Sequence, residues 1–141
     1  MKIDIPLPSI SEQQKVIYQA ATDAAINQLR MNLDAPSIPG PSGFDESQFP
    51  RTHLLREDEG WEPPAPEMVE AFFRHFQTVF PDFDTDMKLA RLLGLRGQSA
   101  DRRIREYKAG TYKVPYGVWN RFLVLTGRVP QDVIQVLAFI V

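Results

Sequence analysis

Residues 89–110 read LARLLGLRGQSADRRIREYKAG and place five arginines within 22 residues while the apolar side chains keep helical spacing. If Ile104 faces a core and each residue advances by about 100°, Ala100 and Tyr107 fall on the same side. The other side carries short, polar or basic residues: Gln98, Ser99, Arg102, Arg105, Glu106 and Ala109, with Arg103 at the flank. The stretch therefore predicts a helix from about Ser99 to Ala109 whose outward face is basic.

The formal charge is divided unevenly along the chain. Residues 1–83 carry 6 Lys/Arg against 13 Asp/Glu, and residues 84–141 carry 10 against 5. The net charge of -2 therefore conceals a first part at -7 and a second part at +5. Such asymmetry indicates an anionic partner for the C-terminal part.

Length and composition bound the architecture. A chain of 141 residues with 43% apolar and 24% charged residues can bury one core, or one small core plus an appendage. The absence of cysteine excludes disulfides, a thiolate nucleophile and a cysteine-ligated zinc site. No apolar run approaches the roughly 20 residues of a membrane span, and the opening MKIDIPLPSI lacks the apolar core of a signal peptide. We expect a cytoplasmic protein with no membrane partner.

The first half of the chain predicts an arm and a linker. Residues 1–34 form a helical arm, with a capping pattern at Ser9 or Ser11 and a helix from about Ser11 to Leu33. Residues 35–65 form an acidic, Pro-rich linker, because proline removes donors and forbids a continuous helix. A fully flexible linker would not need large apolar side chains, so we expect some of these to pack on a surface: Phe44, Phe49, Leu54, Leu55 and Trp61.

The second half predicts an all-α domain over residues 66–141. Helical spacing, capping residues, prolines and glycines indicate five helices, over about residues 66–80, 86–95, 99–109, 115–127 and 130–141. No strand pattern of comparable strength is present. The predicted fold is a five-helix domain preceded by an N-terminal helix and a Pro-rich arm.

The order of residues in this domain resembles the Cro/phage-repressor (XRE-type) helix-turn-helix family over roughly residues 66–135. The residues that carry the resemblance are Thr85, Leu89-Ala90, Gly94-Leu95, Ile104, Tyr107-Lys108, Gly110, Pro115 and Trp119. The resemblance implies a five-helix domain whose second helix supports the third, which enters the major groove of DNA. It also implies sequence-specific binding to double-stranded DNA and a role as a prokaryotic or phage transcriptional regulator.

Several positions acquire expected roles from the resemblance. Thr85 and Lys88 would contact phosphate at the start of the supporting helix. The full predicted DNA-binding set is Thr85, Lys88, Arg96, Gln98, Ser99, Arg102, Arg103, Arg105 and Lys113. Two features depart from the family pattern: Asp86 replaces the glutamine that commonly follows the threonine, and RGQSAD makes the turn about four residues longer.

The sequence offers no catalytic or metal site, so we predict neither an enzyme nor a cofactor. Asp82, Asp84 and Asp86 alternate like the opening of a calcium loop, but Met87 and Leu93 occupy the positions that need glycine and glutamate. No phosphate loop, nucleophile elbow or paired-carboxylate signature is present.

The sequence indicates two further partners: a second copy of the chain and a different protein. Ala20, Ala21 and Ala24 form a stripe of small residues, and residues 133–141 contain eight apolar residues in nine. Both features suit a homodimer, although the last segment also suits core packing. The rival function is a helical protein-binding adaptor or inhibitor that uses residues 1–65 to wrap a protein partner.

Overall fold

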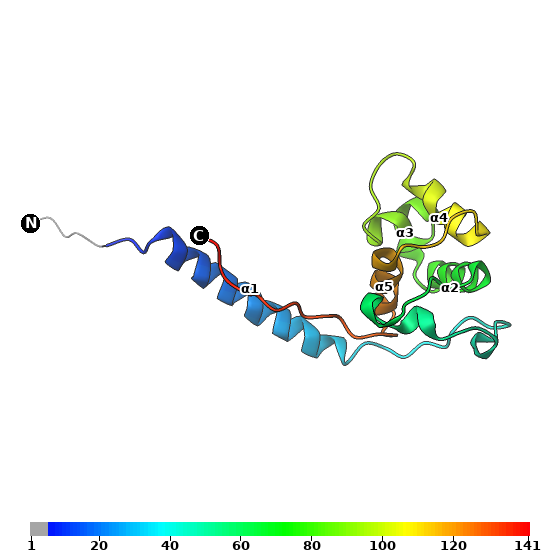
Figure 1. Cartoon of the computed structure of the whole chain (residues 1–141), viewed down its shortest axis with the longest axis horizontal. Coiled ribbons are helices and arrows are strands. Elements are labelled where there is room, and N and C mark those ends of the chain that lie inside the picture. The colour runs from blue at the N-terminus through cyan, green and yellow to red at the C-terminus, as the bar shows by residue number, and fades with distance from the viewer. Residues whose placement is uncertain (1–5) are drawn as a thin grey trace, which may run out of the picture. The chain divides into compact units, whose positions relative to one another are not determined.

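The computed structural model describes residues 6–141 and divides the chain into two units. The larger unit is Pro39–Val133, and the smaller unit joins the chain up to Ile38 with Ile134–Val141. Over residues 6–141 the protein is all-α, with five α-helices and no strand (Figure 1). The first five residues of the expected N-terminal arm lie outside the described part.

Four α-helices form the larger unit. They are α2 (Pro66–Val79), α3 (Asp86–Leu92), α4 (Ala100–Ala109) and α5 (Tyr116–Leu125). The segments outside these helices contain four short 3-10 helices: η1 (Glu46–Gln48), η2 (Thr52–Leu54), η3 (Glu57–Glu59) and η4 (Pro81–Phe83). The sequence predicted these four helices close to their observed ends, because Pro66, Thr85, Gly110 and Pro115 mark where helices begin or end.

An aromatic cluster fills the centre of the larger unit. The ring of Phe73 on α2 lies 4.9 Å from Phe122 and 5.8 Å from Trp119, both on α5. Trp119 and Phe122 stack at 5.2 Å between centroids, and all three residues are buried. Burying side chains of this size contributes more to stability than any other contact type in so small a unit.

The segment expected to be a linker packs onto this core. Four of its five large apolar residues are partly buried against the core cluster, namely Phe44, Phe49, Leu54 and Trp61. Leu55 is the one of the five that stays exposed. Residues 39–65 are thus part of the larger unit and cover one side of it.

His53 anchors that covering segment. It is only 2% exposed, and its Nδ1 accepts a hydrogen bond from the indole Nε1 of Trp119 at 3.1 Å. The Trp61 indole also donates to the His53 carbonyl at 3.1 Å. Since an indole can only donate, Nδ1 carries no proton, and the remaining ring proton belongs to Nε2.

The surroundings of His53 favour its neutral form. Burial lowers the pKa of His53 below its ordinary value, and the positive charge of Arg128 acts in the same direction. Glu46 opposes this effect because its Oε1 lies 3.3 Å from Nε2, although the two atoms lack hydrogen-bond geometry. The Glu46 carboxylate is itself held by Arg128 at 2.6 Å.

The smaller unit contains one long helix and an extended tail. α1 spans Ile10–Asn32, and Ser9 and Glu12 form a reciprocal capping box at its start, which is one of the two capping patterns that the sequence offered. The tail Ile134–Val141 runs beside α1 in the opposite direction (Figure 1), and the Phe139 ring meets the Tyr18 ring edge-on at 4.9 Å.

The predicted helix over residues 130–141 is wrong, because this segment forms no helix or other regular element. Five of the last nine residues are β-branched, and these lose side-chain freedom when placed in a helix. No polar side chain stands ready to cap the start, where Pro130 follows an apolar valine. The apolar content suggested a core helix, but the domain closes without it.

The state of His53 predicts a pH dependence of stability. Because the pKa of His53 is lower in the folded chain, the unfolded chain binds a proton there more readily below about pH 6.5, so the free energy of unfolding should fall as pH drops through that value. For a single proton this slope is at most about 1.4 kcal/mol per pH unit. Urea unfolding between about pH 7.5 and about pH 5 would measure it.

The His53→Gln variant should be less stable than the wild type at neutral pH. Its free energy of unfolding should no longer fall with pH between about pH 6.5 and about pH 5. His75→Gln serves as the control, since this second histidine lies at the edge of the unit beside the Pro39 carbonyl. A wild-type stability that does not change over this range would contradict the account of His53.

Candidate nucleic-acid interface

The rotation of α4 is fixed by its buried side. Ile104 and Ala100 are fully buried and Tyr107 nearly so, while Arg102 and Arg105 keep 69% and 55% of their side chains exposed. The helical phase predicted from the sequence is therefore confirmed for these five residues. Because the inward face packs on α2 and α3, the outward arginines stand on a rigid support.

The end of α4 is also tightly held. Gly110 adopts a left-handed conformation with φ of 78°, and its backbone N–H bonds to the last carbonyls of the helix. A side chain there would place its Cβ only 2.7 Å from Cγ of Pro66, the first residue of α2. Only glycine satisfies both the backbone angle and the close approach.

A polar cluster joins α4 to α3 and α2. Lys108 Nζ donates to Asp86 Oδ1 and to Gln77 Oε1, each at 2.8 Å, and Gln77 Nε2 donates to Asp86 Oδ1 at 3.1 Å. A carboxylate at position 86 would repel phosphate if it faced outward. The Asp86 carboxylate instead points inward, where the Lys108 ammonium neutralises it, and Arg105 lies 4.0 Å away.

The connection from α3 to α4 spans seven residues, Leu93–Ser99. A helix-turn-helix turn usually has about three or four, so the lengthened turn predicted from the sequence is observed. Gly94 and Gly97 both have positive φ, at 86° and 101°. The guanidinium of Arg103 donates to the Arg96 carbonyl and braces the connection from α4.

The two outward arginines make only weak internal ion pairs. Arg102 lies 3.4 Å from Glu106, and Arg105 lies 2.9 Å from Asp101, each one turn along the helix. The hydrogen bond from Arg105 lowers the pKa of Asp101. Exposed pairs of this kind contribute about 0–1 kcal/mol, so a phosphate or a base edge can replace the carboxylate at small cost.

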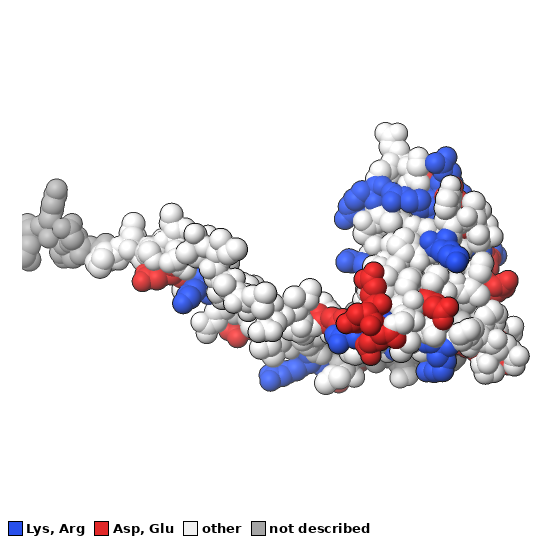
Figure 2. All heavy atoms as spheres, viewed as in Figure 1, with Lys and Arg blue, Asp and Glu red and all other residues white. Residues whose placement is uncertain are grey.

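The other predicted binding residues occupy different surroundings. Thr85 caps α3 through its Oγ1, which accepts from the Lys88 backbone N–H at 3.2 Å. Lys88 Nζ pairs with Asp84 at 3.2 Å. The remaining positions are exposed in the connections on either side of α4: Arg96, Gln98, Ser99 and Lys113. In Figure 2, basic side chains gather over the α3–α4 end of the larger unit.

Two basic residues outside the predicted set belong to the same neighbourhood. Arg91 is exposed on α3, on the side opposite its buried leucine Leu89. Arg121 on α5 donates from Nε to the Leu92 carbonyl at 2.8 Å and ties α5 to the end of α3. Helical spacing from Leu89 could have identified Arg91, whereas the Arg121 contact depends on tertiary structure.

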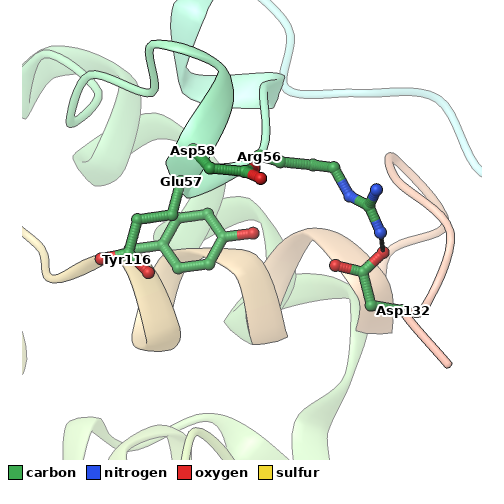
Figure 3. Close-up of a pocket in the computed structure, with 5 residues that line it drawn as sticks. All are labelled: Arg56, Glu57, Asp58, Tyr116 and Asp132. Atoms are coloured by element: carbon green, nitrogen blue, oxygen red, sulfur yellow. Dashed lines mark hydrogen bonds and ion pairs between the residues drawn. The ribbon is translucent and has the colours of Figure 1, made fainter. Parts of the chain in front are cut away.

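An acidic hollow is formed by different elements of the larger unit. Its lining is Arg56, Glu57, Asp58, Tyr116 and Asp132, and Figure 3 shows the Arg56 guanidinium pointing to the Asp132 carboxylate. The bond to Asp132 raises the pKa of Arg56. This surface carries more negative than positive charge and suits a basic ligand.

Metal and membrane features are few in the described chain. Residues 6–141 contain no cluster of three or more His, Asp or Glu side chains placed to hold a metal ion. Asp84 and Asp86, from the calcium-like alternation, engage different lysines. None of the described helices has the length and apolar character needed to cross a membrane.

No known protein family, curated protein or solved structure gives a significant match to this chain. The site is therefore interpreted from its own geometry.

The two sides of α4 should respond differently to truncation. Ile104→Ala should lower the free energy of unfolding by about 2–5 kcal/mol, because it opens a cavity beneath the helix. Arg102→Ala should change it by less than about 0.5 kcal/mol, because the side chain is exposed. Urea unfolding of both variants would measure the difference. Equal losses in both variants would contradict the rotation described for α4.

Proposed function

We propose that this protein binds double-stranded DNA, with α4 lying in the major groove. The observation that carries the proposal is the amphipathic character of α4, whose buried side fixes it against α2 and α3 while Arg102 and Arg105 face water. An arginine on a rigid helix can form two hydrogen bonds to guanine O6 and N7 or can clamp a phosphate.

The distribution of charge supports this proposal. From Lys88 to Lys113 the chain carries eight basic residues against Asp101 and Glu106. Both acidic residues pair with arginines on the same helix, so the surface around α4 remains positive. Positive surfaces concentrate phosphate backbones and contribute most of the sequence-independent affinity for DNA.

The seven-residue connection modifies the expected contact set. Arg96, Gln98 and Ser99 extend from it beside the N-terminus of α4, where backbone N–H groups add partial positive charge. We assign this connection and α4 together to the DNA-facing surface, with Thr85 and Lys88 at phosphates on the α3 side.

On this proposal the protein is a transcriptional regulator of the Cro/phage-repressor type. Contacts to phosphates fix its register, and side chains of α4 read bases. A single short helix reads few base pairs, so two copies on a two-fold site would give useful specificity. Occupancy of the site would then block or recruit polymerase.

A protein-binding adaptor is the second candidate function. The acidic hollow at Arg56, Tyr116 and Asp132 favours it, because a basic peptide would find complementary charge there. Substitutions on α4 should weaken the binding of DNA, whereas substitutions in the acidic hollow should weaken the binding of a basic peptide.

Arg102→Ala and Arg105→Ala should each weaken binding to a duplex by about 1–3 kcal/mol if the side chain contacts a base. If the contact is to phosphate, the loss should be nearly independent of sequence, and the salt slope should fall by about one. A duplex selected from random sequence, titrated at about 50 and about 200 mM salt, provides the measurement.

Arg74→Ala is the matched control. Arg74 is also an exposed arginine that pairs with a glutamate one turn away, Glu70, but it lies on α2. It should bind the selected duplex as the wild type does. Full duplex affinity in the Arg102→Ala, Arg105→Ala double variant would contradict the proposal and favour the adaptor.

A further inference from the structure

α1 is a long helix with no buried residue. It spans 23 residues, and every one of its side chains is exposed within the chain. An isolated helix is marginally stable in water, and amphipathic helices gain most of their stability from packing of the apolar side. The exposed apolar residues of α1 therefore lack the contacts that such a helix normally uses.

The tail Ile134–Val141 covers only one flank of α1. Phe139 packs edge-on against Tyr18, and the tail groups with the helix in the smaller unit. Tyr18, Ile26 and Leu29 are the best shielded large apolar residues of α1, and even they remain more than two-fifths exposed. An eight-residue tail without regular structure is too narrow to bury the helix.

A second flank of α1 has no cover. Ile10, Ile17, Ala24 and Met31 recur every seven residues, which keeps them on one side of the helix. Ile17 is 69% exposed. This side is distinct from the Tyr18 flank, because Ile17 and Tyr18 are successive residues about 100° apart around the axis.

The tail has an open side as well. Ile134, Leu137 and Ile140 are among the most exposed apolar residues of the protein, with Ile140 at 99%. Residues 129–141 make no backbone hydrogen bond to any other described residue. Burying such a segment requires a partner that also supplies donors and acceptors.

We infer that α1 and the tail form an interface between two copies of this chain. The 23-residue helix and the eight tail residues offer 31 residues, and the open flank and open side among them would supply part of the roughly 20–30 residues per side of a standard interface. A two-fold contact presents the same patch on both copies, so each copy would cover the open α1 flank and the open tail of the other.

The balanced charge of α1 and the tail favours a second copy of this chain over a strongly charged partner. The described charges on α1 are Glu12, Lys15, Asp23 and Arg30, two of each sign, and residues 133–141 carry no charged side chain. Two copies therefore meet without net repulsion. A nucleic acid or an anionic membrane would find no excess of positive charge on these two segments.

Analytical ultracentrifugation of the full chain without DNA tests this interface directly. From about 1 to about 100 µM the wild type should shift from monomer to dimer, and helicity measured by circular dichroism should rise with concentration because α1 orders on association. Ile17→Glu and Leu137→Glu should each raise the dimer dissociation constant at least about tenfold.

Leu125→Glu is the matched control, since Leu125 is an exposed leucine of α5 in the larger unit. It should leave association unchanged, as should the Arg102→Ala, Arg105→Ala double variant that tests DNA binding. A wild type that stays monomeric at about 100 µM would overturn the inference. So would unchanged association in both glutamate variants, or binding of the monomer to neutral lipid vesicles through these residues.

Discussion

The burial of Ala100, Ile104 and Tyr107 on one side of α4 is the constraint on which the proposed DNA-binding surface depends. These side chains have no other place to pack, and together they fix the rotation of a ten-residue helix. The arginines between them are thereby forced into water. The Lys108 contacts with Asp86 and Gln77 reinforce the same orientation from the edge of the helix.

A second set of interactions keeps that support rigid. The Trp119 indole lies between the aromatic core and the His53 ring, so the segment 39–65 is tied to α5 by a buried hydrogen bond. The indole N–H groups of Trp61 and Trp119 both have acceptors on His53, and His53 Nε2 lies 3.3 Å from the Glu46 carboxylate, which limits the cost of burying these groups. Helix α4 and the covering segment thus share one core.

The sequence predicted the local parts of this structure well. Helix ends followed from Ser9, Thr85, Gly110 and Pro115, because caps and breakers act over a few residues. The phase of α4 followed from Ile104 alone. The binding of DNA remains a prediction that rests on charge and on the resemblance to helix-turn-helix proteins.

The features that escaped prediction depend on distant residues. His53 is buried because Trp119, 66 positions later, donates to it, and no local pattern reveals that pairing. Asp86 is harmless to an anionic ligand only because Lys108 reaches it from another helix. The tail at residues 133–141 has the composition of a core segment, but it forms no helix and its side chains stay exposed.

Nuclear magnetic resonance of the wild type during titration with a selected duplex tests the central claim most directly, because it locates the contact surface residue by residue. The account predicts that the largest shifts fall on Gln98, Arg102 and Arg105, including their side-chain N–H groups. The signals of Glu57, Tyr116 and Asp132 should stay in place. Shifts confined to that acidic hollow, or no shifts at a saturating concentration of duplex, would contradict it.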